Sequence, residues 1–169
     1  MTVMVAGSVL VRVNMAKPFK SVWTEADYAE MSWHDNHVHG LAIHAGQYGS
    51  GELELDIDYI LEWLPSEDGR YRFRLAPATL RFQDVTDLRI ALDYVNPTAA
   101  ITPFSISAIG REERIYPNGH KTFQWSLGVN WPEGGISFSA SGYTQTIRGE
   151  PIVTTEQFLT DAERGAGAL

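Results

Sequence analysis

Alternation of apolar and charged residues is the clearest pattern in this chain. From Glu52 to Trp63 the sequence reads ELELDIDYILEW, with an apolar residue at every second position. Successive side chains of a β-strand point to opposite faces, so this period of two predicts a half-buried strand. An α-helix would instead scatter the carboxylates around its circumference. We therefore predict a strand with one apolar face and one acidic face.

Shorter stretches of alternation predict further strands. They lie at residues 37–45, 71–76, 79–82, 88–94, 104–109, 114–116, 123–129 and 136–140. Turn-forming residues separate them, and Pro77 predicts a break between the second and third of these strands. Gln83–Asp87 is predicted to be a turn. Short helices are predicted only at Glu25–Met31 and from Thr155 to a point before Gly165.

Closely spaced strands with few helices predict a mainly β fold. The absence of strand–helix–strand alternation argues against doubly wound and TIM-barrel folds. The turn spacing favours an antiparallel β-sandwich or flattened barrel with two short flanking helices. The chain has 169 residues, which is typical of one domain. We predict an N-terminal extension at residues 1–14, a single β-rich domain at residues 15–164 and a flexible tail at residues 165–169.

Composition narrows the classes of partner. The net charge of −8 repels phosphate backbones, so nucleic acid is not an expected partner. The chain has no cysteine, which excludes disulfides, thiolate chemistry and cysteine-ligated metals. No apolar run reaches the roughly 18 residues that span a bilayer, and residues 1–13 lack the basic start and cleavage site of a signal peptide. We expect a cytoplasmic protein without membrane contact.

Histidines cluster in one segment: four of the five lie between His34 and His44. On a strand, His37 and His39 share a face at a separation of about 6.5–7 Å, and two imidazoles so placed can bind one divalent ion. The candidate ligand set is His37, His39, Asp35 and His120, with His34 and His44 as further donors. A divalent metal is the cofactor that such a site would hold. A solvated or hydrogen-bonded histidine pair beside a turn explains the same residues without a metal.

The acidic face of the strand predicted at residues 52–63 carries a row of carboxylates: Glu52, Glu54, Asp56 and Asp58. Like charges in a row repel one another unless they are solvated or partnered. Arg70, Arg72 and Arg74 follow with the same spacing and the opposite sign, so cross-strand ion pairing is the leading interpretation. A surface for a cationic partner is the second interpretation. Paired carboxylates for acid–base catalysis are the third, because nearly every acidic strand would qualify.

The tryptophans and the catalytic motifs indicate less about function than the histidines and carboxylates do. Trp63 and Trp125 alternate with polar residues and are predicted to lie in the core. Trp33 and Trp131 lie at predicted element ends, where an aromatic ring can line a pocket or an interface. The sequence contains no glycine-rich phosphate loop and no Gly-x-Ser-x-Gly nucleophile elbow, so an enzyme is the less favoured class.

Two segments, Ser32–Asn36 and Gly51–Trp63, resemble those of small bacterial proteins of uncharacterised function. The resemblance implies a bacterial source and a cytoplasmic setting, but no activity and no site residues. In size and acidity the chain is also similar to immunity proteins that neutralise basic toxins. This second likeness is an analogy without a shared motif.

These observations together predict a non-enzymatic binding or interaction protein. Its acidic hairpin, from Trp33 to Trp63, would engage a basic protein partner, and self-association is the other interaction expected. The residues expected to bind are Trp33, Asp35, Glu54, Asp56 and Asp58. The alternative is a metal-binding protein or metal-dependent enzyme that uses His37 and His39. A third interpretation is a barrel that holds an apolar ligand.

Overall fold

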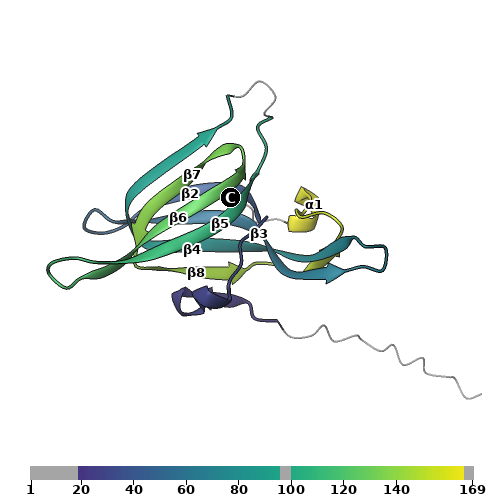
Figure 1. Cartoon of the computed structure of the whole chain (residues 1–169), viewed down its shortest axis with the longest axis horizontal. Coiled ribbons are helices and arrows are strands. Elements are labelled where there is room, and N and C mark those ends of the chain that lie inside the picture. Colours follow the sequence, from purple (N-terminus) through teal and green to yellow (C-terminus); the bar gives the residue numbers. More distant parts are fainter. Residues whose placement is uncertain (1–18, 96–99, 166–169) are drawn as a thin grey trace, which may run out of the picture.

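The chain folds into one antiparallel sheet of nine strands that partly closes into a ring (Figure 1). The computed structural model describes residues 19–95 and 100–165. The strands are β1 Val22–Thr24, β2 His37–Ala45, β3 Gly51–Pro65, β4 Tyr71–Asp93, β5 Phe104–Ile115, β6 Lys121–Trp131, β7 Glu133–Ala140, β8 Gly142–Ile147 and β9 Ile152–Thr154. Within the described ranges, the helices are a short 3-10 helix η1 (Glu25–Glu30) and a short α-helix α1 (Asp161–Arg164). The predicted mainly β, antiparallel fold with two short helices is confirmed. The predicted extension at residues 1–14, and the predicted tail after Gly165, lie outside the described residues.

The ring runs in the order β4, β3, β2, β5, β6, β7 and back to β4. β4 closes it because its two halves have different neighbours. The first half lies between β3 and β8, and the second half, from Thr86 to Asp93, pairs with β7. β2 and β5 meet at only two residue pairs, His37 with Ser105 and Val38 with Phe104. The β2–β5 seam is therefore the shortest contact of the ring.

β4 is one continuous strand, so the predicted break at Pro77 and the predicted turn at Gln83–Asp87 are wrong. The Pro77 carbonyl accepts the Arg148 N–H at 2.8 Å on the β8 side, just beyond the end of β8. The N and C=O of a residue in an antiparallel strand point to the same side, so the missing proline N–H faces a place where no strand pairs. Asp84 and Asp87 have φ angles of 53° and 54°, and they bend β4 where its partners change.

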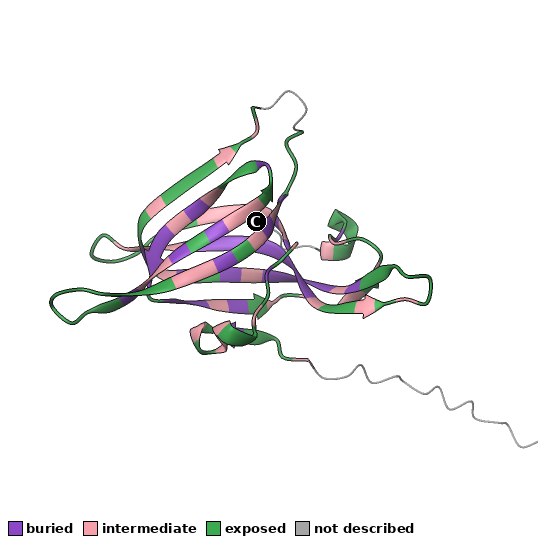
Figure 2. Ribbon diagram, in the orientation of Figure 1, coloured by how far each residue is buried: buried purple, intermediate pink, exposed green. Residues whose placement is uncertain are grey.

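The core fills the inside of the ring. Trp125, Phe82, Phe138 and Tyr143 are its largest fully buried side chains, and Phe82 contacts Trp125 and Phe138 edge to face. Figure 2 shows the buried positions running along the strands of the ring. A second, smaller apolar cluster is formed by Ile60, Phe73, Leu75 and Leu159. Ile60 has the same parity on β3 as the acidic residues, so this cluster lies on the outer face of the β3–β4 hairpin.

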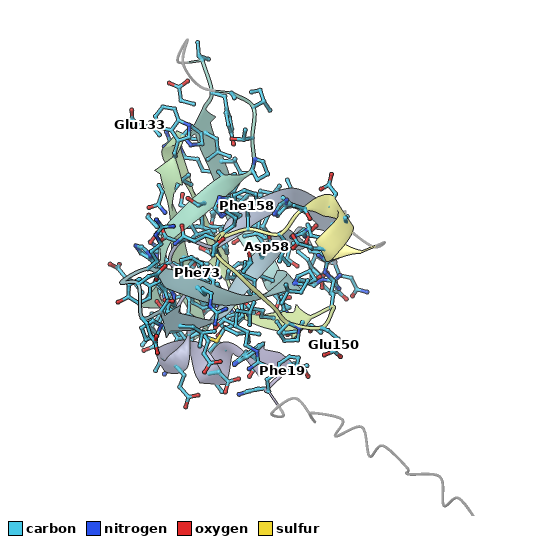
Figure 3. The ribbon with its side chains drawn as sticks, turned by 90° about the vertical axis from the view of Figure 1, so that its right-hand side faces the viewer. Phe19, Asp58, Phe73, Glu133, Glu150 and Phe158 are labelled. Carbon is cyan, nitrogen blue, oxygen red and sulfur yellow. The ribbon has the colours of Figure 1, made fainter. Side chains whose placement is uncertain are left out.

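The C-terminal segment covers that outer face. We call residues Ile152–Arg164 the strap. It begins as β9, which pairs with Phe73–Leu75 on β4, and it ends in α1. Between these points Leu159 enters the second cluster, with 1% of its surface exposed. Figure 3 shows the strap crossing in front of β3, with Phe158 and Asp58 near each other. The strap thus brings the C-terminal residues onto the strand that carries the carboxylates.

Candidate functional site

The carboxylates of β3 lie on the outer face of the sheet because the alternating apolar residues fill the ring. Leu53, Leu55 and Ile57 are completely buried in the core. The acidic face is buried as well: Asp56 is 1% exposed and Asp58 is 0% exposed. The strap, which lies far away in the sequence, covers both residues. The expectation of an open acidic face is therefore wrong for these two carboxylates.

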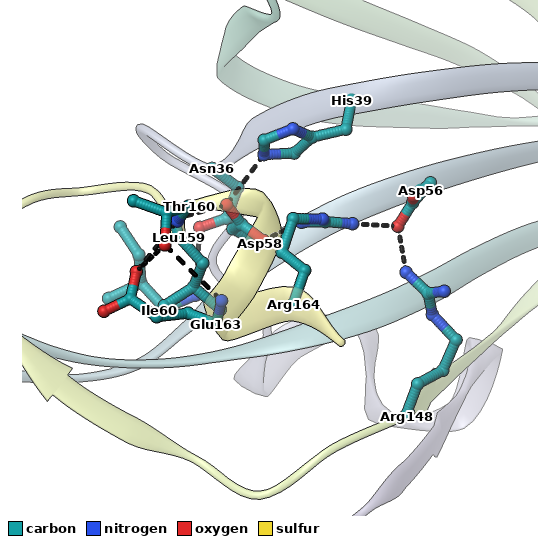
Figure 4. Close-up of polar contacts among 10 residues, drawn as sticks. All are labelled: Asn36, His39, Asp56, Asp58, Ile60, Arg148, Leu159, Thr160, Glu163 and Arg164. Carbon is teal, nitrogen blue, oxygen red and sulfur yellow. Dashed lines mark hydrogen bonds and ion pairs between the residues drawn. The ribbon is translucent and has the colours of Figure 1, made fainter. Parts of the chain in front are cut away.

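Arg164, at the end of the strap, supplies the positive charge that this buried pair requires. Its side chain is 3% exposed. Its guanidinium donates through Nη1 to Asp58 and through Nη2 to Asp56 (Figure 4). Arg148 donates to the same oxygen of Asp56. Charge-assisted hydrogen bonds of this kind are among the strongest in proteins. One planar guanidinium thus joins the two carboxylates.

Asp58 is also bonded to His39 and to the strap backbone. The His39 Nε2 and the Leu159 N–H both approach Asp58 Oδ2 at 2.7 Å. Burial lowers the pKa of His39, and the nearby charge of Arg164 lowers it further. The neutral ring then carries its proton on Nε2, which it donates to Asp58. His39 therefore serves as a neutral hydrogen-bond donor within the site.

The histidine-rich segment also contacts the strap. The His37 ring lies 5.3 Å from the Phe158 ring, measured between centroids, and burial lowers the pKa of His37. Asp35 accepts a hydrogen bond from the Gln157 side chain at 3.0 Å and another from Asn130 at 2.8 Å. The histidine-rich segment and the acidic strand, which the sequence indicates as two separate candidate sites, thus form one surface that binds the strap.

The proposed metal ligands do not converge. Asp35 lies in a turn with a φ of 63°, and a β-bulge between Val38 and Gly40 changes the register of β2 beside His39. His120 lies in the β5–β6 connection, where its ring stacks on Tyr116. In the described part of the chain, no group of three or more His, Asp or Glu side chains is arranged to hold a metal ion. Metal binding therefore stays a prediction from the sequence.

Trp33, proposed from the sequence as a binding residue, lies in the core. It is 3% exposed, and its Nε1 donates to Gln145 at 2.8 Å. Its ring also packs edge to face against Tyr143. Its place before a turn makes Trp33 a candidate for lining a pocket, but its contacts with β8 instead anchor that turn to the core.

Glu54 is 7% exposed and bonds to Arg81, its direct neighbour in the register of β3 and β4. His44 lies on its other side, with Nε2 3.7 Å from the carboxylate. The prediction that Arg70, Arg72 and Arg74 pair with the carboxylate row is wrong. Those arginines lie near the end of the hairpin, where Arg74 is opposite Glu62. The carboxylates of the row do form ion pairs, but their partners are Arg81, Arg148 and Arg164.

A pocket of about 580 Å³ lies between the strap and β2, and His37, His39, Pro103 and Phe158 contribute to its walls. A second pocket of about 390 Å³, between β2 and residues 101–104, also has His39 in its wall. His39, Thr102 and Pro103 line both pockets. Sequence reasoning missed Arg148, Leu159 and Arg164, since no local pattern links these residues to the acidic strand.

No family model matches this chain, and neither a curated protein sequence nor a solved structure is significantly similar to it. The resemblance to small bacterial proteins therefore stays a prediction. Among the described residues, neither short helix is long and apolar enough to cross a lipid bilayer.

Proposed function

We propose that this chain is a binding protein that recognises an arginine-bearing segment of a basic partner at Asp56 and Asp58. In this structure the strap occupies that place with its own Arg164. The partner would displace the strap and put its own guanidinium between the two carboxylates. The observation that supports this proposal is the nearly complete burial of Arg164 between two acidic side chains of one strand.

The site suits a guanidinium better than an ammonium ion. Asp56 and Asp58 lie two residues apart on the same face of β3, and each receives one terminal nitrogen of Arg164. A planar fork with two terminal nitrogens can bond both carboxylates at once, whereas a lysine ammonium is a single point charge. The Leu159 N–H and His39 occupy the remaining oxygen of Asp58. The pair of carboxylates is therefore selective for arginine.

The strap is held by few contacts, which makes its displacement feasible. β9 contributes three residue pairs, and Asp161–Glu163 of the α1 helix are exposed to solvent. Phe158, which lies on His37, is 42% exposed. The net charge of −8 attracts a basic partner and speeds its approach. A partner that offers an arginine and an adjoining apolar side chain could replace both Arg164 and Leu159.

The proposal is tested by peptide binding to full-length protein. A fluorescent peptide with the sequence of the strap, IVTTEQFLTDAER, is titrated with wild-type protein and with Arg164→Ala. A second peptide has citrulline in place of arginine, and a third is an unrelated sequence that contains arginine. We expect the variant to bind both arginine peptides at least about tenfold more tightly than wild-type protein does. The citrulline peptide should bind the variant no more tightly than it binds wild-type protein.

The matched control is Arg74→Ala, which removes an arginine of the same sheet that pairs with the half-exposed Glu62 and lies over the Phe19 ring. It should bind the peptides no better than wild-type protein. Circular dichroism shows whether Arg164→Ala keeps the β fold. If the folded variant binds no arginine peptide, the proposal fails. If it binds only the strap sequence, Arg164 is an internal fastening and the proposed partner is ruled out.

A further inference from the structure

β2 has an open edge. One side of the strand pairs with β3 as far as Ala45, but the other side meets β5 only at His37 and Val38. Within the described residues, Gly40–Ala45 therefore have no strand on that second side. Backbone N–H and C=O groups along such an edge are a template for another strand. The six residues are enough for a short antiparallel pairing.

This edge lacks the charges and prolines that normally protect a strand from pairing, and the β-bulge of β2, between Val38 and Gly40, precedes it. Its sequence, GLAIHA, contains no Lys, Arg, Asp, Glu or Pro, and Ile43 is 62% exposed. Edge strands of monomers usually carry charges, prolines or bulges that prevent association. The open side of β4, at Thr86–Asp93, has these features: it carries Asp87, Arg89 and Asp93, and it is bent at Asp87. β2 therefore presents an uncharged edge, whereas the open side of β4 is charged and bent.

We infer that Gly40–His44 of this edge pairs with the same residues of a second copy of this chain, in antiparallel orientation across a twofold axis. A twofold axis at Ala42 places Leu41 opposite Ile43 of the second copy, and Gly40 opposite His44. The apolar pair then lies on one face of the joined sheets, where cross-strand contacts between aliphatic side chains are favourable. Gly40 and Ala42 are small and allow close approach on the other face.

The charges around this edge favour a second copy as the occupant. A twofold axis brings each residue near its own duplicate, so any charge close to the axis would repel itself. The edge is uncharged, and the nearest carboxylate of β3, Glu54, is bonded to Arg81. The strap contacts the other end of β2 at His37, and its Leu159 N–H shares the Asp58 Oδ2 atom with His39. The pairing is therefore independent of the proposed exchange of the strap.

Light scattering coupled to size-exclusion chromatography tests the inference on full-length protein over a range of concentrations. We expect a species of twice the chain mass of 18.8 kDa. Ile43→Lys adds a charge to the edge at an exposed position, so the fold should persist and the mass should fall to that of one chain. The matched control is Ile90→Lys on the open side of β4, where Ile90 is 40% exposed. This control should leave the dimer intact.

Hydrogen exchange locates the contact. The amides of Gly40–Ala45 should exchange more slowly as the wild-type concentration rises, and should show no such dependence in Ile43→Lys. A wild-type chain that is monomeric at every concentration overturns the inference. So does a dimer that survives Ile43→Lys, or one that both lysine variants abolish, because neither result fits a pairing specific to β2.

Discussion

At the scale of single residues, the buried carboxylates make Arg164 the most sensitive position of the site. The Arg164 side chain is 3% exposed and pairs with both Asp56 and Asp58. Arg164→Ala removes this shared cation from the two buried carboxylates. Breaking a buried ion pair typically costs several kcal/mol, so we expect the free energy of unfolding to fall by about 3 kcal/mol. Arg164→Lys should recover only part of it, because an ammonium does not bridge both carboxylates. Urea denaturation measures both changes, and equal stability of all three proteins would contradict the burial of this charge.

The same site predicts how stability depends on pH. Burial lowers the pKa of His37 and of His39 in the folded protein, from an ordinary value of 6.5. The folded protein then binds fewer protons than the unfolded chain once the pH is below 6.5, so stability is lost as the pH falls from there through the lower folded pKa values. We expect the double variant His37→Asn, His39→Asn to lose less stability over that range. Denaturation at a series of pH values gives the two slopes, and identical slopes would refute the assignment.

At the scale of elements, β3 shows what the sequence predicts and where it stops. The period of two assigns Leu55 to one face and Asp56 to the other, and the structure confirms both. Solvent exposure is not a property of the strand alone: the acidic face is buried because the strap folds over it. Trp63 shows the reverse case, since its predicted core position is 44% exposed near the end of the hairpin. The local pattern determines on which face of the strand a side chain lies. Segments distant in the sequence determine whether that face is covered.

At the bend of β4, residue preferences predict a turn where the strand in fact continues. Gln83–Asp87 has the composition of a turn, yet the strand continues with Asp84 and Asp87 in left-handed conformations. The left-handed region costs a non-glycine residue about 1–2 kcal/mol, and β-branched residues tolerate it worst. We expect Asp87→Val to destabilise the protein by about 1–2 kcal/mol more than Asp87→Gly does. Thermal or urea denaturation of the two variants measures the difference, and a valine variant as stable as the glycine variant would argue against a left-handed Asp87.

At the scale of the whole molecule, the described residues form a large core centred on the ring and a small one beneath the strap. The ring core contains large aromatic side chains such as Trp125 and Phe138, both fully buried. The strap is joined to the ring by the small cluster around Leu159 and by the ion pairs of Arg164. A unit with few buried apolar contacts can open while the rest stays folded. The strap is therefore expected to be the first part of the described chain to open.

Native-state hydrogen exchange tests this order. Amides of the strap should exchange through a local opening, at a lower free energy than amides of Leu55 and Phe138 in the ring. Leu159→Ala removes most of a side chain that is 1% exposed, so strap exchange should accelerate by about thirtyfold, which corresponds to about 2 kcal/mol. Equal exchange free energies for strap and ring would mean that the two unfold together. In that case the strap could not leave a folded ring, and a partner arginine could not take the place of Arg164.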